Sequence, residues 1–221
     1  MTGRSQANRP EAALRSLPDR KSQKARSART RQLLRDAAIQ CLSQHGYGMT
    51  TTTLIAEMAG VSRGAMLHQF PSKADLMIFV VESIFEEQAE YYREQLKAAN
   101  DKRQRLLAYP EAVWASTRRP SGIAMLEIFQ GSRSDHALAA KLSPVQARID
   151  AIAIASLTKE FKREPSVAMF QLIVGAARGL ALGEVIAPAG ETGKDAILLL
   201  RELLEAAAGH QRPDEDLPGG A

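Results

Sequence analysis

Residues 50–73, TTTTLIAEMAGVSRGAMLHQFPSK, constrain the fold of this chain more than any other stretch. They predict a short helix over residues 52–59 and a second over residues 63–70. Gly60 stands where a helix end favours a left-handed residue, and Ser62 can cap the helix that follows. Two short helices joined by a glycine turn are typical of a helix-turn-helix motif, whose second helix can enter the major groove of DNA.

Helical periodicity extends over the rest of the chain, and no alternation typical of a β-strand is present. Residues 24–45 have the apolar stripe of a half-buried helix, formed by Leu34, Ala37, Ala38, Cys41 and Leu42. Gly46 is expected to end that helix. Further helices are predicted over residues 73–99, 103–117 with a kink or break at Pro110, 122–133, 136–142, 144–161 starting at Pro144, 165–187 and 193–208. The sequence therefore predicts an all-α fold of about nine helices, with a three-helix N-terminal domain before a larger helical domain.

The stretch and the residues before it resemble the N-terminal DNA-binding domain of the TetR family of bacterial transcriptional regulators. The matching features are Gly46-Tyr47, the threonine run, Ile55-Ala56, Ala59-Gly60-Val61-Ser62, Gly64, Phe70 and Ser72-Lys73. The close match covers about residues 28–88, and the rest resembles the family's effector domain only in being helical. The family's usual tyrosine five residues after the turn serine is Leu67 here. The phosphate contact typical of that tyrosine is therefore expected to be lost or taken over by His68.

The resemblance implies four segments. They are a disordered basic arm at residues 1–27, a DNA-binding domain at 28–88 with its motif at 51–70, a ligand-binding and dimerisation domain at 89–209, and a disordered tail at 210–221.

The second motif helix is predicted to read DNA. Arg63 and Gln69 can make bidentate contacts to guanine and adenine, whereas exposed Ala65 and Met66 can touch a thymine methyl group. The full set of expected DNA-binding residues is Thr51, Thr52, Ser62, Arg63, Gly64, Ala65, Met66, Leu67, His68, Gln69 and Lys73, with His68 and Lys73 placed for phosphate. The alternative for each is a solvated side chain on a surface helix.

Charge is concentrated at the start of the chain. Residues 1–36 hold ten Arg and Lys against three Asp and Glu, a net charge of +7, while the whole chain carries +4. A basic end on a mildly acidic body suits a polyanionic partner, although a merely soluble, disordered tail is the alternative for residues 1–21. The single cysteine, Cys41, excludes an intramolecular disulfide and suits a reducing bacterial cytoplasm, and no secretory signal is seen.

The predicted helix at residues 165–187 is apolar almost all round, so it is expected to be buried on all sides rather than to cross a membrane. Its glycines at a spacing of four favour close approach of a neighbouring helix. By resemblance, this helix and the last one form a four-helix bundle with a second copy, through Gly175, Gly179, Gly183, Ile197, Leu200 and Leu204. The alternative is that the two helices complete the core of a monomer.

By resemblance, the central helices should also enclose a pocket for an apolar or weakly anionic effector. Its candidate residues are Trp114, Met125, Phe129, Arg133, Ile152, Met169, Phe170, Gln171 and Arg178. The apolar ones could equally fill the core, and Arg178 could pair with Glu184 or Glu202. No zinc-spaced Cys/His set, phosphate loop or nucleophile–base set is visible, so neither a metal, a cofactor nor an enzyme is expected.

These features favour a dimeric, sequence-specific DNA-binding regulator, a repressor that a small-molecule effector releases from its operator. The alternative is a nucleoid-type protein that binds DNA with low specificity and without an effector.

Overall fold

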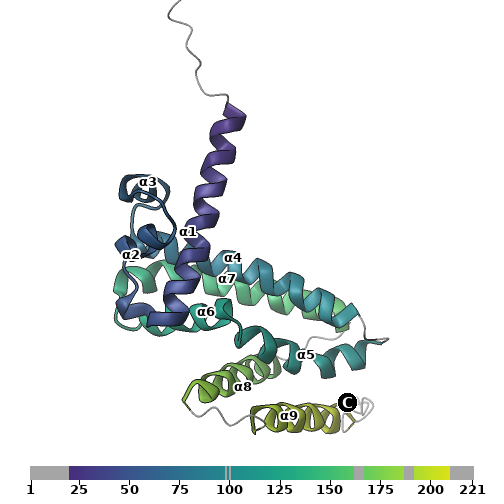
Figure 1. The fold of residues 1–221 in the computed structure, drawn as a ribbon. Coiled ribbons are helices and arrows are strands. Elements are labelled where there is room, and N and C mark those ends of the chain that lie inside the picture. Colours follow the sequence, from purple (N-terminus) through teal and green to yellow (C-terminus); the bar gives the residue numbers. More distant parts are fainter. Residues whose placement is uncertain (1–19, 98, 100, 162–166, 187–191, 210–221) are drawn as a thin grey trace, which may run out of the picture.

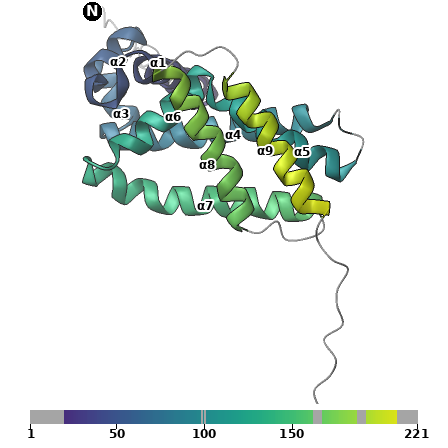
Figure 2. The same cartoon turned by 90° about the horizontal axis from the view of Figure 1, so that it is seen from below.

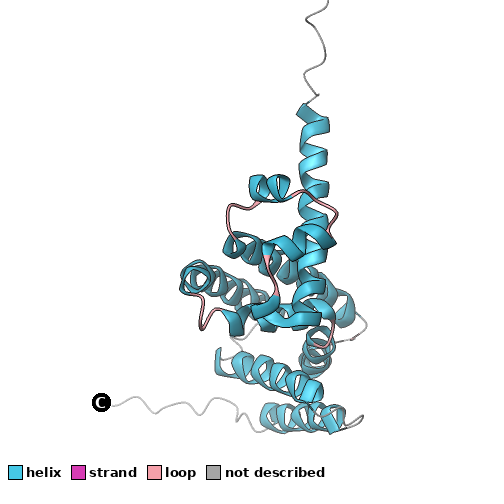
Figure 3. Cartoon of the chain, turned by 60° about the vertical axis from the view of Figure 1, so that its left-hand side comes forward, coloured by secondary structure: helices cyan, strands magenta, loops and turns pink. Residues whose placement is uncertain are grey.

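The computed structural model describes residues 20–97, 99, 101–161, 167–186 and 192–209. All regular elements in these ranges are α-helices, as Figure 3 shows, so the predicted all-α class is confirmed. The helices are α1 (Arg20–Met49), α2 (Thr52–Met58), α3 (Arg63–Gln69), α4 (Lys73–Lys97), α5 (Lys102–Thr117), α6 (Pro120–Gly131), α7 (His136–Phe161), α8 (Val167–Ile186) and α9 (Thr192–Gly209). Residues 1–19 and 210–221 of the predicted arms lie outside the described residues. The expectation of disorder is wrong for residues 20–27, which are helical.

The helices form two linked groups (Figure 1). The small helices α2 and α3 lie beside α1, and the lower end of α1 packs on α6. The long helices α4 and α7 run side by side across the middle of the molecule. At the end farthest from α3, α8 and α9 lie next to each other against α5 (Figure 2).

Two hydrophobic cores correspond to these groups. The first joins the motif helices to α1, α4, α6 and the start of α7, and includes Leu34, Ile55, Met66, Leu76 and Ile128. The second joins α5, α8 and α9 around Trp114, Ile173 and Ile197. The core around α2 and α3 is therefore continuous with α6.

Two prolines lie inside helices, so Pro144 differs from the prediction and Pro110 does not break its helix. Pro144 does not start a helix, because α7 runs continuously from His136 to Phe161, and α5 likewise continues through Pro110. A proline inside a helix removes one backbone hydrogen bond. Pro144 and Ala140, whose carbonyl loses its partner, are both exposed, so water can replace that bond.

The closest approach between α1 and α6 depends on a glycine. A β-carbon placed on Gly131 would lie 2.2 Å from Cγ of the Tyr47 ring, so only a glycine lets the two helices pack this closely. Tyr47 is 9% exposed. The neighbouring break at Gly46, with φ of 73°, turns the chain so that Tyr47 points at α6.

We expect Gly131→Ala to destabilise the protein by about 1–3 kcal/mol, because the new methyl group overpacks against the Tyr47 ring. Gly64→Ala is the matched control. Nothing lies within 4 Å of a β-carbon at Gly64, so this change should stabilise by up to about 1 kcal/mol. Urea unfolding at neutral pH measures both, and a Gly131→Ala protein as stable as wild type would contradict the packing.

Candidate nucleic-acid interface and internal cavity

A side-chain cap holds the N-terminus of each of the helices α2 and α3. The Thr51 hydroxyl accepts a hydrogen bond from the Leu54 amide at 3.1 Å, and the Ser62 hydroxyl accepts one from the Ala65 amide at 3.2 Å. Gly60 has φ of 63°, the left-handed conformation that its position predicted. The orientation of α3 is therefore fixed by local contacts.

Most of the predicted reading surface of α3 is exposed. Its exposed residues are Ser62, Arg63, Gly64, Ala65, Leu67 and His68, while Gln69 is half-buried. On α2, Thr51 is exposed and Thr52 half-buried. The prediction of an exposed Met66 is wrong, because Met66 is 1% exposed and shares the inner face of α3 with Phe70, one turn away. Leu67, which replaces the family's tyrosine, is 42% exposed.

Lys73, which was predicted to contact phosphate, is half-buried and already has a partner within the chain. The Lys73 ammonium donates a hydrogen bond to the Tyr47 carbonyl oxygen at 2.8 Å and lies 3.6 Å from the centre of the Tyr47 ring. Burial lowers the pKa of Lys73, and the charge of Asp135 opposes this shift. Its ammonium is thus engaged at the base of the motif.

A polar groove beside α3 was not anticipated from the sequence. It is lined by Gln23, Lys24, Arg26, Ser27, Thr30, Ala65, His68 and Gln69, and none of these residues is acidic. The Ser27 hydroxyl donates a hydrogen bond to Oε1 of Gln69 at 2.9 Å, which leaves the Gln69 amide nitrogen as the free donor. The net charge of residues 1–36 indicated a basic end, but only the helical path of residues 20–30 places Lys24 and Arg26 next to α3.

Tyr47 links this motif to the rest of the protein. Its amide donates a hydrogen bond to Oε2 of Glu127 on α6 at 2.8 Å, and its hydroxyl donates one to Oδ2 of Asp135 at 2.6 Å. Burial first, and then the carboxylate of Asp135, raise the pKa of the Tyr47 hydroxyl. The same hydrogen bond lowers the pKa of Asp135. Sequence reasoning used Tyr47 only as a motif residue, because its partners are 80 and 88 residues away.

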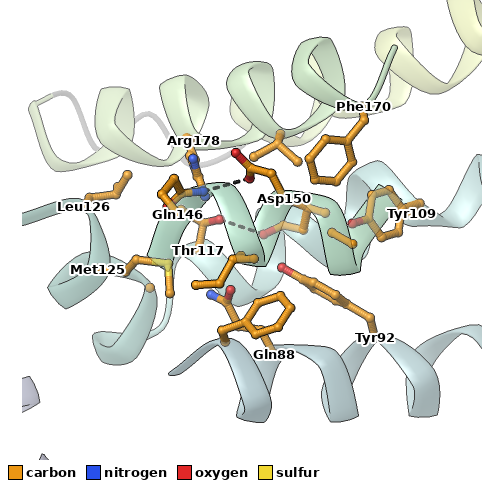
Figure 4. Close-up of a pocket in the computed structure, with 16 residues that line it drawn as sticks. Gln88, Tyr92, Tyr109, Thr117, Met125, Leu126, Gln146, Asp150, Phe170 and Arg178 are labelled. Atoms are coloured by element: carbon orange, nitrogen blue, oxygen red, sulfur yellow. Dashed lines mark hydrogen bonds between the residues drawn. The ribbon is translucent and has the colours of Figure 1, made fainter. Parts of the chain in front are cut away.

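An internal cavity of about 60 Å³ lies between α4, α5, α6, α7 and α8 (Figure 4). Three of the predicted pocket residues, Met125, Phe170 and Arg178, line it. The other lining residues, which were not predicted, are Phe85, Gln88, Tyr92, Tyr109, Val113, Thr117, Gly122, Leu126, Gln146, Ile149, Asp150, Ala153 and Val174.

An open groove between α7 and α8 adjoins this cavity. Phe129 and Gln171, also predicted, line the groove. Five residues line both spaces and separate one from the other: Gln146, Asp150, Phe170, Val174 and Arg178. The groove and the cavity therefore share one wall.

Four predicted pocket residues line neither space. Trp114 packs in the second core beneath the Arg118 guanidinium, 4.4 Å from the ring centre, and Met169 packs against the same core. Ile152 is 46% exposed, and Arg133 is exposed in the turn after α6. Helical periodicity identified helices that lie near the cavity. It could not tell which face of each helix lines the cavity.

The polar groups of the shared wall are only partly satisfied. Gln146 Nε2 donates to Oδ1 of Asp150 at 2.7 Å, whereas Gln146 Oε1 is buried and has no hydrogen-bond partner among the described residues. The Arg178 guanidinium lies 5.1 Å from the centre of the Phe129 ring. Burial lowers the pKa of Arg178, and Tyr92 and Asp150 oppose the shift. The expected pairing of Arg178 with Glu184 is wrong, because Glu184 pairs with Arg118.

The glycines of α8 are exposed, and no atom lies within 4 Å of a β-carbon built on Gly175, Gly179 or Gly183. On α9, however, the predicted stripe faces inward. Ile197 and Leu204 are buried in the second core, and Leu200 packs against it. Ile197 and Leu204 are therefore buried within the single chain, which does not fit their predicted role as dimer contacts, whereas the partly buried Leu200 stays a prediction. The exposed apolar residues of the two helices are Val167, Leu172, Leu182, Leu199 and Leu203.

The helix α8 is also not buried on all sides, as had been predicted. Its segment Val167–Glu184 is long and apolar enough to span a membrane by length and composition, and 22% of it is buried within the chain. Two residues of this segment are charged. Arg178 lines the cavity, and Glu184 forms an ion pair with Arg118. Among the described residues, no group of His, Cys, Asp and Glu is arranged to hold a metal ion.

Residues 34–78 match the model of the tetR family of bacterial regulatory proteins. This segment therefore resembles the TetR family of regulators. The chain is 35% identical over 79 residues to the HTH-type transcriptional regulator CymR of Pseudomonas putida, covering 36% of this chain and 39% of that protein. It is 32% identical over 108 residues to the HTH-type transcriptional repressor AcnR of Corynebacterium diphtheriae, covering 48% of this chain and 51% of that protein. The chain thus spans about half or less of the curated relatives that it matches.

Solved structures share the fold over most of the chain. A putative transcriptional regulator of Pseudomonas aeruginosa PAO1 is similar with a TM-score of 0.63 and 20% identity, over 85% of this chain and 92% of that one. The multidrug binding protein EbrR, solved as a complex with imidazole, is similar with a TM-score of 0.56 and 21% identity, over 79% of this chain and 92% of that one. At these identities, the likeness shows a shared fold alone, over about four fifths of this chain.

We expect Tyr47→Phe to destabilise the protein by about 1 kcal/mol at neutral pH, because it removes the hydrogen bond to the partly exposed Asp135 carboxylate. The pKa of Asp135 is lowered in the folded protein, so this stabilisation is present at neutral pH and is lost as the pH falls through that pKa, below about 3.9.

Urea unfolding at pH 7 and pH 3 measures the effect. The difference between wild type and Tyr47→Phe should shrink at pH 3. The control is Tyr91→Phe, since the Tyr91 hydroxyl makes no hydrogen bond within the described part of the chain. Equal stability of wild type and Tyr47→Phe at pH 7 would contradict a stabilising role for this bond.

Proposed function

We propose that this protein is a dimeric, sequence-specific DNA-binding repressor of the bacterial cytoplasm that a small-molecule effector releases from its operator. The observation that carries the proposal is the presentation of α3: a capped helix whose outward face offers Arg63, Ala65 and His68 to a major groove. The relatives CymR and AcnR are an HTH-type regulator and an HTH-type repressor, which supports repression as the outcome.

The proposed roles of the side chains follow from their exposure. Arg63 is a bidentate donor to guanine, and the Gln69 amide nitrogen donates to a base or phosphate acceptor while Ser27 holds its oxygen. Ala65 and Leu67 offer apolar contacts to thymine methyl groups. Lys24 and Arg26 replace Lys73 as the phosphate-binding cations, because they line the groove beside α3.

Dimerisation is proposed through the exposed face of α8 and α9. Gly175, Gly179 and Gly183 leave the α8 backbone open to close approach, and Leu199 and Leu203 of α9 are 55% and 59% exposed. An apolar surface of this kind is unfavourable in water and is typical of an interface. Two-fold pairing would place two copies of α3 in successive major grooves about 34 Å apart.

Effector response is proposed from the cavity. Its volume of about 60 Å³ is well below the roughly 150 Å³ that encloses a benzene molecule, so a ring-sized ligand must move the walls. Met125 and Leu126 of α6 form one wall, and Glu127 and Gly131 of the same helix hold Tyr47. A ligand that binds the expanded state better therefore shifts the equilibrium towards a displaced α6 and a displaced α3.

A second candidate function is low-specificity DNA binding without an effector. The basic groove formed by Lys24 and Arg26 favours it, because phosphate contacts alone carry no sequence information. The two functions differ in the ratio of specific to non-specific affinity and in the salt dependence of that ratio.

Selection of bound fragments from genomic DNA, followed by gel-shift titration at fixed salt, tests the proposal. We expect Arg63→Ala to weaken operator binding by about 1–3 kcal/mol and to relax the preference at one base pair. Arg93→Ala is the matched control. Arg93 is exposed, pairs only with Glu90 among the described residues and lies near the far end of α4, so its loss should change little. Unchanged affinity and specificity in Arg63→Ala would exclude α3 as the reading helix.

The double change Leu199→Glu with Leu203→Glu tests the proposed interface. It should give a monomer in light-scattering measurements and weaken operator binding by at least about tenfold, because the second half-site is lost. Leu33→Glu, at an apolar position of α1 that is 42% exposed, is the control and should leave the dimer intact. A double variant that stays dimeric would show that another surface joins the copies.

A further inference from the structure

We infer that the cavity accepts an uncharged molecule with a flat apolar body and a polar head that both accepts and donates a hydrogen bond, with Arg178 as the donor to that head and Gln146 Oε1 as the acceptor. That this molecule acts as an effector rests on the proposed function, but its binding can be measured without DNA.

The charge of the cavity wall is already balanced. Asp150 and Arg178 line the same wall, and the carboxylate of Asp150 favours the charged form of Arg178. No other Asp, Glu, Lys, Arg or His is among the residues that line the cavity. An anionic ligand would leave one uncompensated negative charge in this wall and a cationic ligand one positive charge, and burying an unpaired charge is costly. The sequence had suggested a weakly anionic ligand because it revealed Arg178 but not Asp150.

The buried acceptor Gln146 Oε1 indicates that the polar head of the ligand also carries a hydrogen-bond donor. Gln146 Nε2 is used by Asp150, so Gln146 Oε1 is a buried acceptor that lacks a donor among the described residues. A buried acceptor gains most from a ligand that supplies the missing N–H or O–H group. The guanidinium of Arg178 carries five N–H donors and makes no hydrogen bond or ion pair within the described part of the chain, so it supplies donors to an oxygen of the same head.

The remaining wall favours a flat apolar body. Tyr92, Tyr109 and Phe170 line one side of the cavity, and Met125 and Leu126 lie at the other (Figure 4). The Tyr92 hydroxyl is paired with the Ser116 hydroxyl at 2.8 Å, so the rings rather than the Tyr92 hydroxyl face the ligand as its apolar surroundings.

Four probes of nearly the same size separate the possibilities: benzamide, benzoate, benzamidinium and toluene. Benzamide has both an acceptor and a donor, benzoate only acceptors and a negative charge, benzamidinium only donors and a positive charge, and toluene neither. Titration of the full chain at pH 7, by calorimetry and by ligand-observed NMR, measures their affinities, which are expected in the millimolar range for molecules this small. We expect benzamide to bind at least about tenfold more tightly than each of the others.

Two isosteric or near-isosteric variants test the charge balance. Asp150→Asn leaves Arg178 uncompensated, so the preference should move from benzamide to benzoate. Arg178→Met leaves Asp150 uncompensated, so the preference should move to benzamidinium. Loss of structure alone would weaken all four probes together and would not reverse their order. Gln146→Leu should remove the advantage of benzamide over toluene while the two charged probes stay weak.

Each other outcome overturns the inference. Tightest binding of benzoate or of benzamidinium to the wild type would show that Arg178 or Asp150 dominates the site, and tightest binding of toluene would show that the polar wall is not used. Absence of binding by all four at solubility-limited concentrations would remove the cavity as a site for such ligands. If genomic selection still recovers a specific operator, that failure concerns the ligand class and leaves the DNA-binding function standing.

Discussion

The contact between Tyr47 and α6 is the interaction on which the arrangement of this protein depends. Two hydrogen bonds, to Glu127 and Asp135, and a ring that fits only against a glycine fix the end of α1 on the second half of the chain. Because α1 also carries the groove beside α3 and packs on α2, this contact links the helix-turn-helix motif to the helix that lines the cavity. The first hydrophobic core adds to this contact, because it joins α2 and α3 to α1, α4 and α6.

The helix α6 is short and has two different faces. One face lines the cavity through Gly122, Met125 and Leu126, and the other meets α1. A closely packed interior transmits strain, so we expect a displacement on the first face to be felt on the second. The long helix α4 adds a second path: Phe85 and Tyr92 line the cavity, and the start of the same helix follows α3 directly. The proposed response therefore needs no contact between ligand and DNA-binding motif.

Sequence reasoning succeeded where the determining signal is local. The φ of Gly60, the cap of Ser62 and the break at Gly46 follow from the preferences of single residues, and the helical class follows from periodicity. It failed where a face had to be chosen by tertiary packing. The sequence could not tell that Met66 lies on the inner side of α3, or that Ile197 and Leu204 face α5 and α8 while Leu199 and Leu203 remain exposed. Asp150 was missed because its relation to Arg178 arises from two helices that meet only in the folded chain.

The small volume of the cavity has a consequence for how sensitively such a protein can respond. The free energy needed to open the walls is subtracted from every ligand's intrinsic affinity, so the apparent dissociation constant rises as the closed state becomes more stable. In the proposed function, the closed state is the one that binds the operator, so by reciprocity bound DNA also opposes the opening of the cavity. Side chains that fill the space around Met125 and Phe170 would then set a threshold concentration rather than a chemical preference. Two proteins with the same polar groups around the ligand could therefore respond to the same molecule at very different concentrations.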